Sequence, residues 1–156
     1  MKIRLVWYVV LIVVCGTGIG YISTRIQSSC ADFTQGRLVT PSTTLSIALA
    51  ETPEEQATGL GGCRSIPQNS GMYFLMQPAQ TAVFWMKDML IPIDIVWIRN
   101  GEVIGIEDSV PNESAGTLEG DLKRYPSPGE VDGVLEIKAG TSKEYGIEKG
   151  TAIRLD

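Results

Sequence analysis

The chain has 156 residues with a net charge of −5, and 44% of them are apolar and 20% charged. This length suits one globular domain with an appendage, and the composition excludes a disordered chain. The first 30 residues hold Lys2, Arg4 and Arg25 but no acid, which leaves 10 basic and 18 acidic residues, net −8, in residues 31–156. Such a domain lacks the clustered Lys and Arg that phosphate backbones require, so we expect no nucleic-acid partner.

The N-terminal segment, residues 1–22, has the pattern of a membrane anchor or signal. After Lys2 and Arg4, an uncharged run of 18 residues begins at Leu5, a length between that of a secretory signal and that of a membrane-spanning helix. No A-x-A-like cleavage site follows, which favours a retained transmembrane helix over a cleaved signal or a lipidated cysteine. The basic N-terminus predicts that the rest of the chain lies outside the cytoplasm.

The first elements of the folded part follow a polar tether. Residues 23–43 are rich in Ser, Thr, Gln and Gly and predict that tether, and residues 44–156 form the domain. Alternating apolar residues over 45–49 predict a strand. Thr52-Pro53-Glu54-Glu55 predicts a helix that begins with a capping box, and Gly59 predicts its end.

Strands dominate the remaining pattern. We expect them over residues 72–76, 83–89, 93–98, 103–106, 131–138 and 152–155. Asn100-Gly101 is a hairpin signal, so 103–106 should pair antiparallel with 93–98. Residues 111–129 read as a long loop. About seven strands with one short helix predict a mainly β domain, a single small sandwich or barrel.

The strand over 93–98 carries the most unusual charge in the chain. Alternation places Asp94 on a face with Val96 and Ile98, and the opposite face is also apolar. A strand buried on both sides has this pattern, and a carboxylate within it needs a partner. Lys87 is the nearest candidate.

These residues define a candidate ligand-binding site of Lys87, Asp88, Asp94 and Trp85. In the simplest interpretation, Lys87 and Asp94 form an ion pair that sets the register of two strands. Alternatively they bind a ligand at the sheet edge, or Asp94 acts as the general base of a small hydrolase. The sequence shows no nucleophile and base pair, which leaves the catalytic residues unknown and favours a protein that is not an enzyme.

Aromatic and cysteine residues add further alternatives. Trp85 could stack on a sugar ring, as in a carbohydrate-binding module, and an exposed apolar patch would instead mark an adaptor for a partner protein. Cys30 and Cys63 are candidates for a disulfide outside the cytoplasm, with free thiols or a modified Cys30 as alternatives. Without His or a C-x-x-C pair, we expect no metal site and no cofactor.

Four segments resemble a known family. They are GLGGCRSIPQNSGMYF, FWMKDMLIPIDIVWI, VLEIKAG and YGIEKG, and together they resemble the domain of unknown function 192 family, DUF192, over roughly residues 45–155. The resemblance implies a small, mainly β, sandwich-like domain and no established activity. The chain departs from the family pattern with Gly61 for Met, Cys63 for Arg and Asp88-Met89 for Asn-Thr. The cysteine at an arginine position fits a locally added disulfide.

Together these features predict a membrane-tethered extracytoplasmic binding or envelope-associated module. Its ligand would be a sugar or another component of the cell envelope.

Overall fold

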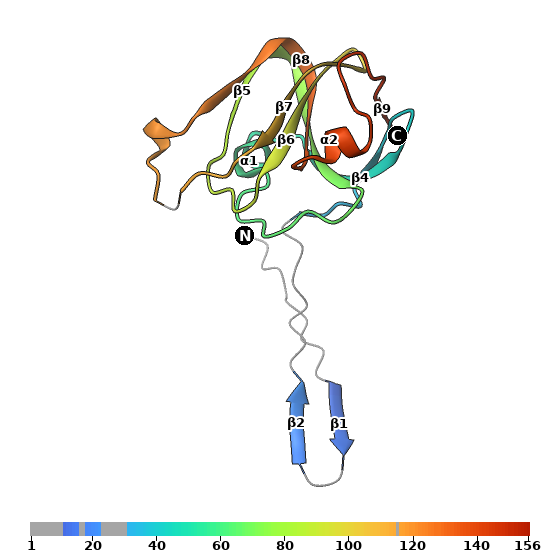
Figure 1. The fold of residues 1–156 in the computed structure, drawn as a ribbon, viewed down its shortest axis with the longest axis vertical. Coiled ribbons are helices and arrows are strands. Elements are labelled where there is room, and N and C mark those ends of the chain that lie inside the picture. Colours follow the sequence, from blue (N-terminus) through green and yellow to red (C-terminus); the bar gives the residue numbers. More distant parts are fainter. Residues whose placement is uncertain (1–10, 16–17, 23–30, 115) are drawn as a thin grey trace.

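A single seven-stranded sheet organises the domain (Figure 1). The computed structural model describes residues 11–15, 18–22, 31–114 and 116–156. Strand order is β7-β6-β8-β5-β4-β3-β9, and neighbours are antiparallel except for the parallel pair β4 and β5. The elements are β3 (Gly36–Val39), β4 (Thr44–Ala50), α1 (Pro53–Thr58), β5 (Ser70–Trp85), β6 (Ile93–Arg99), β7 (Glu102–Val110), the 3-10 helix η1 (Glu119–Asp121), β8 (Arg124–Lys138), α2 (Thr141–Glu144) and β9 (Arg154–Leu155).

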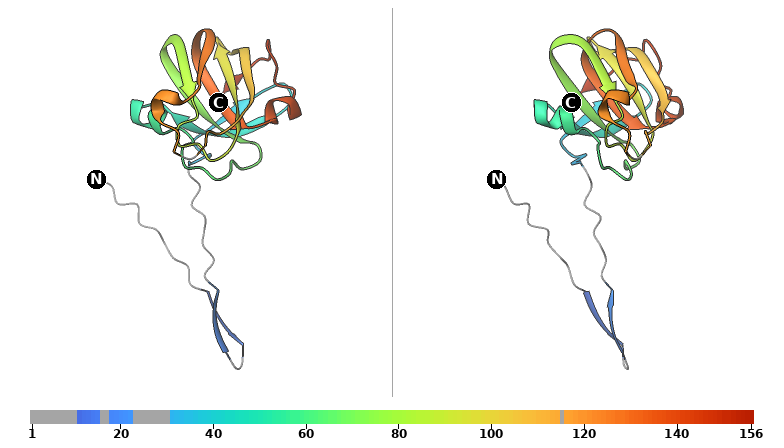
Figure 2. Two further views of the ribbon diagram at one scale, coloured as in Figure 1. Left: turned by 60° about the vertical axis from the view of Figure 1, so that its left-hand side comes forward. Right: turned by 90° about the vertical axis from the view of Figure 1, so that its left-hand side faces the viewer.

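The C-terminal segment joins the two edges of this sheet. β9 pairs with β3 at one edge, while Ala152 forms a bridge with Glu102 in β7 at the other. The Ile153 amide also donates to the Gly101 carbonyl at 2.7 Å. The sheet therefore curls into a half-barrel (Figure 2), which confirms the mainly β prediction and replaces its sandwich alternative.

Apolar side chains cover both faces of the sheet. We call one set the α1-side core, which includes Leu60, Met72, Phe74, Ile93, Ile95, Trp97 and Val134, and the other the α2-side core, which includes Leu38, Tyr73, Val96, Ile98, Leu135, Ile137 and Ile147. The alternation predicted for residues 93–98 is confirmed, because Ile95 and Val96 fall in different cores. The helices α1 and α2 lie on either side of β6 (Figure 1).

Two local predictions are confirmed at atomic detail. Thr52 Oγ1 accepts from the Glu55 amide at 3.2 Å and Glu55 Oε2 accepts from the Thr52 amide at 3.0 Å, which completes the capping box of α1. Asn100 and Gly101 have φ of 50° and 73°, the conformation that a tight β6–β7 hairpin requires. Both signals depend on residues adjacent in sequence.

Three predicted boundaries are wrong. β3 lies inside the segment interpreted as a tether, and its Leu38 is fully buried. The strands predicted over 72–76 and 83–89 are one long strand, β5, which contains a bulge and ends before Lys87. The predicted loop over 111–129 is shorter, because β8 already begins at Arg124. All three boundaries depend on pairing between strands that are far apart in the sequence, which the local pattern does not reveal.

The predicted membrane segment is only partly described. Leu11–Cys15 and Gly18–Ile22 form two short antiparallel strands, β1 and β2, so the expected helix is not supported there. Among the described residues, no helix has the length and apolar character needed to cross a membrane. Residues 1–10, 16–17 and 23–30 of the predicted anchor and tether lie outside the described residues.

Candidate functional site

Asp94 is fully buried, and its carboxylate accepts hydrogen bonds on both oxygens. Oδ1 accepts from the amides of Ser109 at 2.8 Å and Gly140 at 3.0 Å. Oδ2 accepts from the amide of Ser142 at 2.9 Å and from its hydroxyl at 2.7 Å. The side chain thus joins β6 to the end of β7 and to the first turn of α2.

The local backbone conformation positions these donors toward Asp94. Ser109 lies at a register shift between β6 and β7 with φ of 52°, and Gly140 caps α2 with φ of 82°. The first amides of a helix have no partner within the helix, so they are available to an acceptor. An ion pair between Lys143 of α2 and Asp108 of β7 holds the two elements together. The hydrogen bond from Lys143 lowers the pKa of Asp108.

The predicted pair of Lys87 and Asp94 is wrong. Lys87 Nζ instead lies 2.6 Å from Glu119 Oε2, and the two side chains are 45% and 58% exposed. The hydrogen bond and then the charge of Glu119 raise the pKa of Lys87, and the same contacts lower the pKa of Glu119. Because β5 ends at Trp85, Lys87 leaves the sheet before it could reach Asp94 on the α2 side. Asp88 is exposed in the same turn with φ of 58°.

A pocket of about 330 Å³ opens between α1 and the distal part of β5. Trp85 and Lys87 line it, whereas Asp88 and Asp94 do not. Asp94 is fully buried and does not line this pocket, so the pocket gives a substrate no access to it as a general base. The lining residues are Gln56, Ala57, Thr58, Gly59, Leu60, Phe74, Met76, Gln80, Thr81, Ala82, Val83, Phe84, Trp85, Lys87, Met89 and Glu136.

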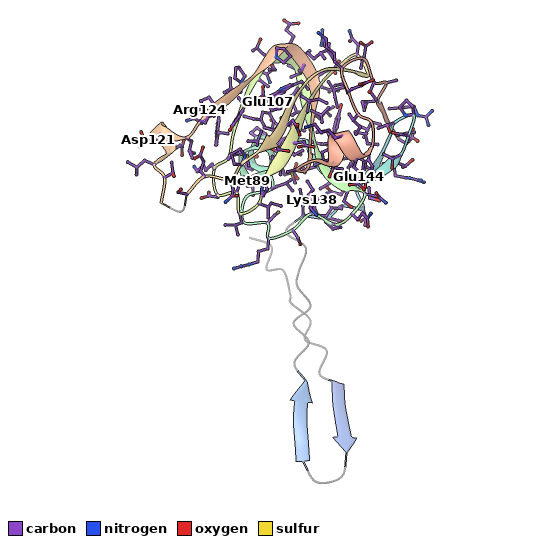
Figure 3. The ribbon with its side chains drawn as sticks, viewed as in Figure 1. Met89, Glu107, Asp121, Arg124, Lys138 and Glu144 are labelled. Atoms are coloured by element: carbon purple, nitrogen blue, oxygen red, sulfur yellow. The ribbon has the colours of Figure 1, made fainter. Side chains whose placement is uncertain are left out.

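Aromatic rings form the wall of the pocket. Phe84 packs edge-to-face against Phe74, with centroids 4.9 Å apart, and against Trp97 at 5.5 Å. Trp85 is 39% exposed, and the Arg124 guanidinium lies 4.3 Å from its ring centroid. Figure 3 places Arg124 beside the projecting turn that carries Asp121. One face of the Trp85 ring is thus already covered by a cation.

Glu136 is the residue of this pocket that sequence reasoning missed. It is 5% exposed on β8, between Met72 and Ile95 of the neighbouring strands. Its Oε2 has no hydrogen-bond partner among the described residues, and burial raises its pKa to about 8. The signal was an acid between Leu135 and Ile137 in an apolar run. We interpreted the run only as a strand.

The turn that follows α1 is fixed by Cys63, which is 1% exposed and disulfide-bonded. Its amide donates to the carbonyl of Leu60, a pocket-lining residue, at 3.0 Å. The predicted partner, Cys30, lies outside the described residues, so that pairing stays a prediction. Within the described part of the chain, no group of three or more His, Cys, Asp or Glu residues is placed to hold a metal ion.

Comparisons with known proteins give a family and two similar structures. The model of the family DUF192, described as "Uncharacterized ACR, COG1430", matches residues 37–155. A crystal structure of a protein of unknown function from Novosphingobium aromaticivorans DSM 12444 has 28% identity and a TM-score of 0.68, over 76% of this chain and 83% of that one. A second, described as a "putative transcription regulator" from Sinorhizobium meliloti 1021, has 27% identity and a TM-score of 0.67, over 77% and 91%. No curated protein matches.

Proposed function

The chain belongs to the DUF192 family, and we propose that it is a membrane-tethered extracytoplasmic module that binds a small, largely apolar ligand in the pocket between α1 and β5. A pocket of about 330 Å³ is at the lower end of the size range of small-molecule sites. Its apolar lining favours a ligand with an aromatic or aliphatic body.

The observation that carries this proposal is the carboxyl group of Glu136. A buried polar atom without a partner is destabilising, and interiors normally avoid it. Here the unpaired Oε2 belongs to a residue that lines an apolar pocket. A polar group of a bound ligand would satisfy it, which is the arrangement of a binding site rather than of a core.

Two residues of the predicted site retain a place in this proposal. Trp85 and Lys87 line the same pocket and are both partly exposed. They are the residues that an entering ligand would meet. Asp88 lies in the exposed turn after β5 and Asp94 holds the sheet to α2, so neither residue belongs to the proposed ligand site.

The proposed location is supported by two features. The uncharged run of 18 residues after Lys2 and Arg4 favours a membrane anchor with its N-terminus in the cytoplasm. The disulfide at Cys63 is typical of an oxidising compartment outside the cytoplasm. The net charge of −8 over residues 31–156 does not favour a nucleic-acid partner such as the description of the Sinorhizobium protein would suggest.

A carbohydrate is the second candidate ligand, because Trp85 is 39% exposed and could present the free face of its ring to a sugar. The first candidate is favoured, since Leu60, Phe74, Met76 and Phe84 give the lining a large apolar share.

The test is a titration of the full chain followed by two-dimensional NMR, with ethylbenzene as the apolar probe and a panel of sugars and peptidoglycan fragments. Ethylbenzene should shift the amide signals of residues 57–60 and 80–85, and Trp85→Ala should weaken its binding. Leu118→Ala is the matched control, because Leu118 is an exposed apolar residue outside the pocket. Shifts from sugars alone would favour the second candidate. Shifts from no probe would contradict both.

A further inference from the structure

We propose that this pocket selects ligands that carry an ammonium group, with the Glu136 carboxylate as the counter-ion, so that the ligand is a small organic amine with an apolar body. The inference rests on the proposed function and names the chemical class of its ligand.

The first step is that Glu136 is a buried polar group of the pocket with unused hydrogen-bonding capacity. Gln56 Nε2 already donates to the Leu75 carbonyl at 2.9 Å, and Thr58 Oγ1 donates to the Glu54 carbonyl at 2.8 Å. Glu136 Oε2 has no such partner within the described part of the chain. A ligand that enters the pocket therefore finds at Glu136 a carboxyl oxygen without a partner, which accepts a hydrogen bond once the group is ionised.

The second step is the sign of the ligand's charge. An ionised carboxylate in apolar surroundings needs a cation or several N–H donors. Asp94 receives such donors from turns, but Glu136 lies mid-strand, where the backbone amides are paired in the sheet. Phe74 and Phe84 also line the pocket, and aromatic rings attract cations. The acidic domain adds a weaker, long-range attraction.

The third step concerns the other charges around the pocket. Lys87 and Glu136 are the charged residues among those that line it, and the lining residues of α1 and β5 are uncharged. On β6, the residues beside Glu136 are Ile95 and Trp97, also uncharged. Lys87 is paired with Glu119 and does not neutralise Glu136. An anionic ligand would gain no ion pair with Glu136, whereas an ammonium ligand gains one with the ionised carboxylate.

Binding should be linked to loss of a proton. Burial raises the pKa of Glu136 to about 8, so the carboxyl is mostly protonated in the empty pocket at neutral pH. An ammonium ligand binds the ionised form, and the displaced proton passes to the buffer. Affinity should therefore rise between pH 6 and pH 8 by more than about tenfold, and then level off until the amine itself loses its proton.

The experiment titrates the full chain with four probes of one skeleton, followed by NMR: benzylamine, benzyl alcohol, ethylbenzene and phenylacetate. Benzylamine should bind about tenfold to a hundredfold more tightly than ethylbenzene at pH 8, the range expected of a hydrogen bond between charged groups. Glu136→Gln should abolish this preference. Glu130→Gln is the control, because Glu130 is exposed on the same strand.

A calorimetric titration of the wild-type chain in two buffers of different ionisation enthalpy should detect the released proton, whether or not Glu136→Gln folds. Equal binding of benzylamine and ethylbenzene would overturn the inference, because the pocket would then not select for charge. A preference for benzylamine that survives Glu136→Gln would also overturn it, because Glu136 would not be the counter-ion. Tighter binding of phenylacetate would also overturn it. If none of the four probes binds, the proposed function fails as well.

Discussion

The side chain of Asp94 is stabilised by three amides and one hydroxyl rather than by a cation. The amide donors come from the irregular part of β7 at Ser109 and from the start of α2, where amides lack a regular hydrogen-bond partner. Glu136 is buried to a similar degree but receives no comparable donors from the described residues, and burial raises its pKa. The two buried acids thus differ in their surroundings. The Asp94 carboxylate is surrounded by N–H and O–H donors, whereas the Glu136 carboxyl faces a pocket.

Replacing Asp94 with Asn should destabilise the domain. The amide group would turn an NH₂ toward an N–H donor in place of a carboxylate oxygen, which leaves buried donors unpaired. We expect a loss of about 3 kcal/mol in the free energy of unfolding, measured by urea denaturation. Asp121→Asn, at an exposed position in η1, should have almost no effect. An Asp94→Asn variant as stable as the wild type would show that these hydrogen bonds do not hold α2 in place.

At the scale of elements, the pairing of β5 with β8 builds the pocket wall. Near the middle of this pair, the Tyr73 ring lies directly over Gly133, and a Cβ added there would lie 1.9 Å from the Tyr73 hydroxyl. Tyr73 is buried in the α2-side core, and closely packed interiors resist such a displacement. Glycine is therefore required at this position by packing and not by backbone conformation.

Gly133→Ala should lower the free energy of unfolding by about 2–3 kcal/mol, as overpacking of a core does. Gly129→Ala on the same strand is the matched control, because a Cβ there meets nothing within 4 Å. Its effect should stay within about 0.5 kcal/mol. Both values come from urea denaturation followed by tryptophan fluorescence. Equal effects of the two substitutions would mean that Tyr73 can move aside.

At the scale of the whole molecule, the disulfide of Cys63 connects the domain to another cysteine of the chain. The chain has three cysteines, so the partner within the chain is Cys15 or Cys30. The sequence favours Cys30, because Cys15 lies inside the predicted membrane segment. A Cys30–Cys63 bond would attach the predicted tether to the turn beside the pocket.

Mass spectrometry of the unreduced full chain should find the peptide that crosslinks Cys30 to Cys63. Cys30→Ser should release one reactive thiol and cost about 4 kcal/mol of stability, the amount expected from closing a loop of this size. Cys15→Ser is the control and should leave the crosslink intact. A crosslink from Cys15 to Cys63 would contradict both this pairing and the retained anchor.

The sequence by itself determined the features that depend on neighbours along the chain. The capping box of α1, the Asn100-Gly101 hairpin and the two-sided burial of residues 93–98 follow from short-range geometry and alternation. The family resemblance, which implied a mainly β domain, also rests on local motifs. Trp85 and Lys87 were singled out by residue type, and both line the pocket.

Only the tertiary structure decided the partners of the buried acids. The donors to Asp94 lie 15 to 48 residues further along the chain, in an irregular part of β7 and a helix start whose positions depend on the curl of the sheet. The pocket around Glu136 combines α1, β5 and β8, which sequence order does not bring together. A buried charge is stabilised by whatever lies within about 3 Å of it, and those contacts are set by strand register and packing over the whole chain.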